Sequence, residues 1–181
     1  MSRRPAHSFY LWLLQVIILS LLLLFFLWLA LRPSSPSFTL TNFSIDTTTS
    51  NNASSISFSI GFSNDNKRGR VYYDKINITV YSRNASIATT RLEAFDQGHE
   101  KSSSVSGEVF GGGREWDEVV KVIERRRRVR LRVELVAAVR YRIWLWRSRW
   151  HWMDVEAGIS VGFGGKISGR RKKIKMHRAQ N

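Results

Sequence analysis

The residues that usually carry catalysis are few in this sequence and are not grouped for it. No cysteine is present, which excludes cysteine nucleophiles, zinc fingers and disulfide bonds. The glycine runs in "FGGGRE" and "FGG" lack the Lys-Ser/Thr of a phosphate-binding loop, so they indicate flexible connections. The four histidines belong to no metal or nucleophile motif: His7, His99, His151 and His177. We therefore expect no catalytic residue, no cofactor, no metal and no enzymatic activity.

Candidate sites of N-glycosylation are more frequent than candidate catalytic residues. The chain carries four N-x-S/T motifs, and none has proline in the middle position. The motif in the turn-like stretch "SRNAS", at Asn84, is the strongest candidate. The motif at Asn42 lies closest to a long apolar stretch and is the weakest. The candidate sites are Asn42, Asn52, Asn77 and Asn84. Together they predict a glycoprotein whose residues beyond 40 lie outside the cytosol.

The stretch "YRIWLWRSRWHWM" combines tryptophan with arginine and has two interpretations. In the first, which we favour because aromatic stripes usually pack, Tyr141, Ile143 and Leu145 face the core. In the second, the tryptophans and arginines form an amphipathic contact surface, since both residue types are enriched at interface hot spots and suit membrane interfaces. The candidate contact residues are Trp144, Trp146, Arg147, Arg149, Trp150 and Trp152.

Positive charge is concentrated in the second half of a chain with net charge +15. Residues 33–100 hold six basic and six acidic side chains, whereas residues 101–181 hold twenty basic and eight acidic ones, a net charge of +12. Such a half attracts acidic polysaccharide, lipid headgroups or nucleic acid. The final stretch "GRRKKIKMHRAQN" resembles a nucleic-acid-binding tail, and we expect residues 164–181 to be a disordered basic tail.

The apolar stretch at residues 9–31 predicts the element that positions all of these groups. It is as long as a membrane-spanning helix requires and longer than the apolar part of a cleaved signal. Arg3 and Arg4 precede it, so the positive-inside rule predicts that residues 1–8 are cytosolic. The remainder then lies outside the cytosol, after a linker at residues 32–37, in a type II single-pass arrangement. On that side the basic tail meets anions other than nucleic acid.

Alternation of apolar and polar residues dominates the outer part and predicts β-strands. It is clearest in four stretches: "SSISFSIGF", "KINITVY", "RVRLRVEL" and "DVEAGISVGF". Weaker strands are expected at 38–45, 87–93, 105–110 and 139–146, and one short helix at 115–125. Asp74 is expected to bond to backbone two residues on. The fold class is all-β: a transmembrane helix, then an antiparallel seven-stranded fibronectin-like or immunoglobulin-like β-sandwich over residues 38–163.

The order of several short motifs behind the apolar stretch resembles the plant NHL family. These are harpin-induced-like and non-race-specific-disease-resistance-like membrane proteins with a late-embryogenesis-abundant type 2 domain. The resemblance covers most of the chain. The matching stretches are "LRPSSPSFTLTNFSI", then "SNDNKRGRVYYDKINITVYSRNASI" with Asn64, Asn66, Tyr73 and Asp74, then "AFDQGHEKSS" with Phe95 and Gln97, and then "VAAVRYRIWLWRSRWHWMDVEAGISV" from Val139 and Arg140 onward. The chain departs from the family pattern at Asp65, Tyr141 and Arg142, and it lacks the usual late cysteine.

The resemblance implies a sandwich outside the plasma membrane, plasmodesmata included, with roles in plant immunity and stress response and without catalysis. We expect the lipid bilayer to be contacted through residues 9–31. The other expected partners are acidic wall polysaccharide or lipid headgroups, and proteins or further copies of the chain. Two alternatives stay open. One is a structural stress protein that tethers or protects the membrane during dehydration, and the other is a cytosolic basic protein that binds nucleic acid.

Overall fold

The computed structural model describes residues 5–31, 34–47, 54–143, 145–168 and 173–179. The chain divides into two compact units, residues 1–34 and 35–181. The first unit contains helix α1 (Pro5–Leu31). Within it, Phe9–Leu29 is long and apolar enough to cross a membrane, and none of this segment is buried against protein. Length and composition therefore agree with the predicted span.

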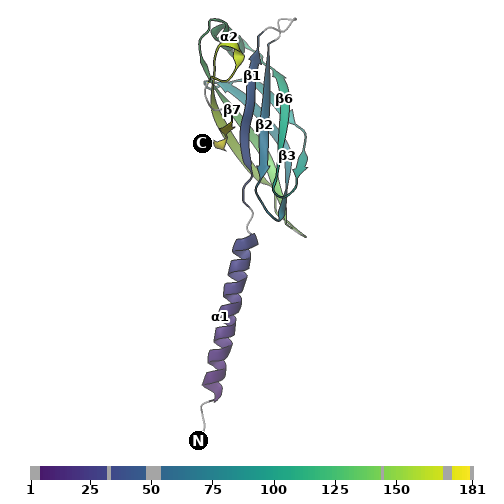
Figure 1. Cartoon of the computed structure of the whole chain (residues 1–181), viewed down its shortest axis with the longest axis vertical. Coiled ribbons are helices and arrows are strands. Elements are labelled where there is room, and N and C mark those ends of the chain that lie inside the picture. The colour runs from purple at the N-terminus through teal and green to yellow at the C-terminus, as the bar shows by residue number, and fades with distance from the viewer. Residues whose placement is uncertain (1–4, 32–33, 48–53, 144, 169–172, 180–181) are drawn as a thin grey trace. The chain divides into compact units, whose positions relative to one another are not determined.

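The second unit is an antiparallel β-sandwich, as predicted. One sheet has the order β10-β1-β2-β6 and the other β11-β9-β7-β3-β4, with β5 paired to β3 and β8 paired to β7. Figure 1 shows β1, β2 and β6 in front of β3 and β7. The strands are β1 (Ser37–Asp46), β2 (Ser55–Asn64), β3 (Gly69–Ser82), β4 (Ala85–Leu92), β5 (Phe95–Gln97), β6 (Lys101–Phe110), β7 (Val129–Ile143), β8 (Trp146–Arg147), β9 (His151–Val161), β10 (Ile174–Lys175) and β11 (His177–Arg178).

Period-two alternation builds the core between the sheets. In β2, the apolar side chains from Ile56 to Phe62 are buried, and the serines between them point outward. Gly107 of β6 lies opposite Phe58, where an added Cβ would come within 2.7 Å of the phenyl ring. The missing side chain at Gly107 therefore leaves the space that the ring of Phe58 fills.

Helix α2 (Arg114–Glu124) closes one end of the sandwich, within one residue of the predicted bounds. Trp116, Val119 and Ile123 are buried at helical spacing. The indole Nε1 of Trp116 donates a hydrogen bond to Ser54 Oγ at 2.7 Å. Gly111 contacts the indole so closely that a larger residue would displace it. A short 3₁₀ turn, η1 (Phe163–Gly165), follows β9.

The two ends of the sandwich carry different connections. At one end, Ser35 lies near the β2–β3 turn at residues 65–68 and the β7–β9 connection around β8, and we call this the Ser35 end. The α2 end contains the β3–β4 turn at residues 83–84, helix α2 and the connection at residues 125–128. Strand β2 runs from the α2 end to the Ser35 end, and β3 returns.

Two predictions from the sequence are wrong, and the first concerns strand boundaries. The stretches 128–135 and 139–146 form one strand, β7, which ends at Ile143. Between them, Ala137 and Ala138 are both buried, so the strand is covered on both faces there. The irregularity lies in β3 instead, where the register with β7 shifts between Asp74 and Asn77.

The second error concerns the C-terminal segment, which was expected to be disordered. Strand β10 pairs with β1, and β11 pairs with β9. Between them Met176 is buried, and its N–H donates to the carbonyl of Phe38 at 2.9 Å. This segment covers one edge of each sheet, because its apolar residues alternate with the basic ones.

Candidate interaction surfaces

The residues that carry the family resemblance form a buried polar network at the Ser35 end. Asn64 Nδ2 donates to the carbonyls of Gly69 and Gly98, each at 2.8 Å. Its Oδ1 accepts from the backbone N–H of Asn66 at 3.1 Å and from that residue's Nδ2 at 2.8 Å. One fully buried side chain thus joins the β2–β3 turn to the β5–β6 turn.

Tyr73 extends this network into the core. Its hydroxyl donates to Gln97 Oε1 at 3.1 Å, and Gln97 Nε2 donates to the carbonyl of Phe62 at 2.9 Å. The ring of Tyr73 stacks on Phe95 with centroids 4.8 Å apart. Burial raises the pKa of Tyr73 above its ordinary value, with a smaller contribution from Tyr141. These groups are satisfied by one another, so their role is structural.

Asp74 also has a structural contact, although not the expected one. Its Oδ1 accepts from the backbone N–H of Lys75, the next residue, at 2.8 Å. Lys75 has φ 50°, in the left-handed region, at the point where the register of β3 shifts. The carboxylate therefore stabilises a β-bulge rather than a turn.

The histidines are not brought together. His99, His151 and His177 are each exposed, in different connections and strands. Among the residues that the structure describes, no group of three or more histidine, aspartate and glutamate side chains could hold a metal ion.

The glycosylation candidates differ in accessibility. Asn84 is exposed in the tight β3–β4 turn, directly after Arg83 at φ 56°. Asn42 is exposed on β1 where the register with β2 shifts. Asn77 is half-buried on a central strand, and its Oδ1 accepts from Arg91 Nε at 3.1 Å. Asn52 lies outside the described residues. Asn84 and Asn42 are therefore both accessible, and of these two only Asn84 lies in a turn.

The tryptophan-arginine stretch is largely on the surface. Leu145, predicted to face the core, is 98% exposed because β7 ends at Ile143 and the alternation stops. Arg147 and Arg149 are also exposed, and Trp144 lies outside the described residues. The exposed fractions are 61% for Trp146, 45% for Trp150 and 63% for Trp152. We call Leu145, Trp146, Arg147, Arg149, Trp150 and Trp152 the hairpin patch.

Ser148 fixes the base of this patch, and sequence reasoning missed it. The Ser148 N–H donates to the carbonyl of Tyr141 at 2.9 Å, and its Oγ accepts from the Tyr141 N–H at 3.0 Å. The same hydroxyl donates to the carbonyl of Arg149 at 2.8 Å. Ser148 is buried between exposed arginines. A small polar residue inside "WRSRW" was the available signal.

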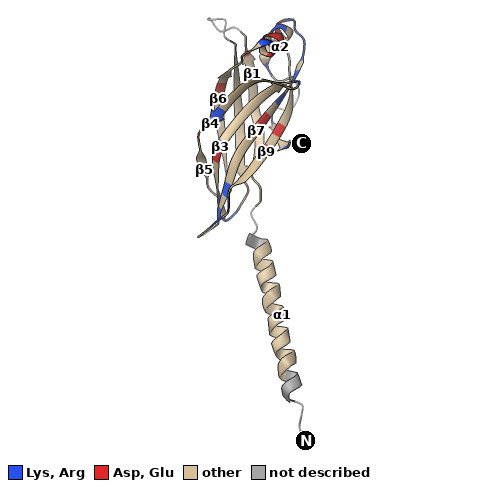
Figure 2. Cartoon of the chain, turned by 180° about the vertical axis from the view of Figure 1, so that it is seen from behind, with Lys and Arg blue, Asp and Glu red and all other residues tan. Residues whose placement is uncertain are grey.

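The α2 end carries a basic cluster, Arg125–Arg128 with Arg130, all exposed. Figure 2 shows Lys and Arg on α2 and the connection after it. Within the described part of the chain, none of the five is in an ion pair. Arg126 instead stacks on the ring of Phe163, at 4.8 Å. Four consecutive arginines therefore project uncompensated positive charge.

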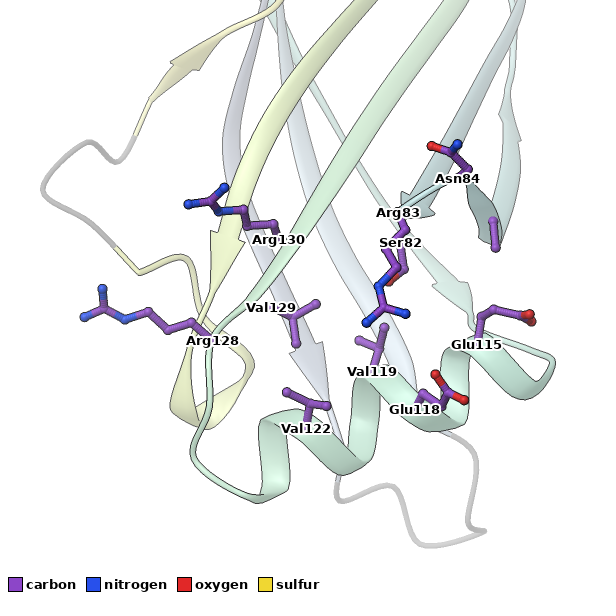
Figure 3. A pocket seen from close by; sticks show the side chains of 11 residues that line it. Ser82, Arg83, Asn84, Glu115, Glu118, Val119, Val122, Arg128, Val129 and Arg130 are labelled. Atoms are coloured by element: carbon purple, nitrogen blue, oxygen red, sulfur yellow. The ribbon is translucent and has the colours of Figure 1, made fainter.

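A cleft of about 670 Å³ adjoins the basic cluster, between the β3–β4 turn, α2 and the start of β7. Figure 3 shows Val119, Val122 and Val129 in it, with Arg83 above the helix. Glu115 and Glu118 lie on the side away from Arg128 and Arg130. The exposed Arg83, which borders the cleft, was not singled out from sequence. The acids partly balance the cleft, so the basic cluster is the more electropositive site.

The outer face of β1, β2 and β6 is uncharged over most of its area. Ser59 Oγ lies 2.9 Å from Ser104 Oγ and accepts from Ser106 Oγ at 3.1 Å. Ser102 Oγ donates to Ser63 Oγ at 3.1 Å. We call these serines, with Ser57, Thr39 and Thr41, the hydroxyl face.

Comparison with known proteins assigns no family. No family model matches the chain, and no curated protein matches it. A solved structure from Archaeoglobus fulgidus is similar over 73% of this chain and 99% of its own, with 11% identity and a TM-score of 0.39. This likeness is too low to transfer anything.

Proposed function

We propose that the protein is a non-catalytic, single-pass membrane protein whose sandwich, outside the cytosol, binds acidic polymers through the α2 end. One observation carries the proposal: Arg125–Arg128 and Arg130 are exposed and have no ion pair within the described residues, at the end of the sandwich opposite Ser35. Clustered unpaired charge attracts polyanions and speeds their association.

The charges that flank the apolar helix support this side of the membrane. Arg3 and Arg4 precede the apolar helix, and after Arg32 no basic residue occurs until Lys67. Asn84, in an accessible turn, is suited to glycan addition. Acidic wall polysaccharide is then the polyanion that the basic cluster would meet in a plant.

The family resemblance supports a place in plant defence or stress response at the plasma membrane. Proteins or further copies of the chain remain proposed partners in that response. Because the resembling side chains around Asn64 and Tyr73 are buried and satisfied, any specific recognition has to come from surface residues.

The test is retention of the full-length, detergent-solubilised protein on immobilised polygalacturonate. Substitution of Arg125, Arg127 and Arg128 by Gln should abolish most of the retention at low salt. The control is the triple substitution of Lys67, Arg68 and Lys101 by Gln, which removes the same charge from the Ser35 end, outside the hairpin patch, and should retain binding. Wild-type retention should weaken as salt rises. Equal losses in both triple variants, or retention that salt does not affect, would refute the proposal.

A second candidate, protection of the membrane during dehydration, is favoured by the hydroxyl face. Its regularly spaced serines can hydrogen-bond to water or to lipid phosphates without any charge. Leakage of dried and rehydrated vesicles that contain the full-length protein separates the two candidates. Protection that survives neutralisation of the basic cluster but not bulky substitution of the hydroxyl face would favour this second function.

A further inference from the structure

The hairpin patch gathers most of the exposed apolar surface of the sandwich. In the described part of residues 35–181, six large apolar side chains are exposed, and four of them lie between residues 145 and 152. Exposed tryptophans concentrated in this way mark a contact surface, because isolated apolar residues are normal but clusters are not. The other two, Phe110 and Phe163, lie at the α2 end.

The patch is held in place rather than loosely attached. Strand β8 pairs with β7, and Ser148 makes three hydrogen bonds at its base. The guanidinium of Arg140 lies over the ring of Trp150, 5.5 Å from its centroid. Side chains on a hairpin whose base is fixed in this way lose little conformational entropy when they are bound.

Uncompensated charge borders the same tip. Arg142 of β7 lies in register between Arg147 of β8 and Arg70 of β3. Arg70 pairs with Asp96 at 3.4 Å, but within the described residues Arg142 and Arg147 have no ion pair. Like charges directly opposite each other destabilise a sheet. The three aligned arginines therefore favour the binding of an anion beside the tryptophans.

The place of the patch in the chain identifies that anion. Ser35 hydrogen-bonds to the hydroxyl of Tyr141, which is on the strand that leads into the hairpin. Ser35 follows Leu31, the last residue of α1, by four residues, and four extended residues reach at most about 14 Å. The Ser35 end is thus tethered by a short link to the end of the predicted span.

We infer that the hairpin patch is a second membrane contact, inserted among the phospholipid headgroups of the bilayer that α1 spans. Tryptophan prefers the interface between headgroups and hydrocarbon, and arginine pairs with lipid phosphate from the same depth. The chain is then attached to the bilayer at two points, α1 and the hairpin patch. This inference rests on the membrane anchoring in the proposed function.

The chain offers a clean test, because it contains no cysteine. Leu145→Cys and Phe110→Cys each replace one exposed apolar residue, at opposite ends of the sandwich. Each full-length variant is labelled with a nitroxide and reconstituted into phosphatidylcholine vesicles, with and without phosphatidylglycerol. Electron paramagnetic resonance then measures how readily oxygen and a water-soluble nickel chelate reach the label.

The inference predicts a ratio of oxygen to nickel accessibility several-fold higher at position 145 than at position 110. Free access of both reagents to position 145 would overturn it and indicate a tip in water. Exclusion of both reagents would also overturn it and indicate burial against another protein copy. Resistance of both variants to carbonate extraction checks the anchor separately. A water-exposed tip on a carbonate-resistant protein would refute only the second contact.

Discussion

The two ends of the sandwich are stabilised by different interactions, and they expose different kinds of side chain. At the Ser35 end, a buried network around Asn64 and Gln97 joins the turns, and tryptophans face outward. At the α2 end, apolar packing of Trp116 holds a helix in place, and arginines face outward. At both ends, the residues that stabilise the fold are therefore different from the exposed residues that are free to bind a partner.

We expect the largest loss of stability from a substitution in the apolar packing of the α2 end. Trp116→Ala removes a buried indole and should lower the free energy of unfolding by about 3–5 kcal/mol. Urea unfolding of the full-length protein in detergent measures this, with Phe110→Ala as a control because that ring is exposed. A loss below about 1 kcal/mol would show that α2 is not part of the core.

The next effect breaks the Ser35 end. Asn64→Ala leaves the carbonyls of Gly69 and Gly98 without their donor, and should cost about 3 kcal/mol. Ser104→Ala removes a hydroxyl from the exposed hydroxyl face and should cost under about 0.5 kcal/mol. If the two variants unfolded at the same urea concentration, the buried network would contribute no more to stability than an exposed hydroxyl does.

A smaller effect is expected from pH, through the buried hydroxyl of Tyr73 at the Ser35 end. Because burial raises the pKa of Tyr73 in the folded state, its contribution is complete below the unfolded value of about 10 and is lost as pH rises beyond it. Stability should therefore fall in alkaline solution. Tyr73→Phe should cost about 1 kcal/mol at neutral pH and reduce the alkaline loss. Burial also raises the pKa of Tyr141 and of Tyr81, so part of the loss should remain. An unchanged pH profile in the variant would assign the alkaline loss elsewhere.

The smallest effect concerns the surface charges. Replacing Arg125, Arg127 and Arg128 by Gln should change the free energy of unfolding by less than about 0.5 kcal/mol, because these exposed side chains have no ion pair within the described residues. Differential scanning fluorimetry compares the variant with wild type. A marked loss of stability would show that the basic cluster supports α2, and a loss of polyanion retention could then follow from misfolding.

Periodicity predicted most of the fold but not its surfaces. Alternation found β2 and β9, and helical spacing found α2, because burial of one face imposes those patterns. It failed at Leu145, since alternation predicts facing only while a strand continues, and β7 stops two residues earlier. It also failed at Met176, because the surrounding basic residues hid a short apolar alternation that docks through strand pairing.

The candidate surfaces depend on contacts that sequence does not display. Asn64 and Gln97 are far apart in the chain, yet both bond to backbone groups near the β2–β3 turn. Ser148 fixes the base of the hairpin patch only because the hairpin folds back on Tyr141. The excess of positive charge after residue 100 was evident from the sequence. The topology was needed to place the basic cluster and the hairpin patch at opposite ends of the sandwich.

The most direct test of the account asks which side of the membrane the sandwich occupies. Phe110→Cys supplies a single thiol on an exposed residue of a chain that has no other. Intact plant protoplasts that express this variant are treated with a membrane-impermeant maleimide before and after permeabilisation. If the sandwich lies outside the cytosol, intact cells should be fully labelled. Labelling only after permeabilisation would put the sandwich in the cytosol and refute the proposed membrane orientation.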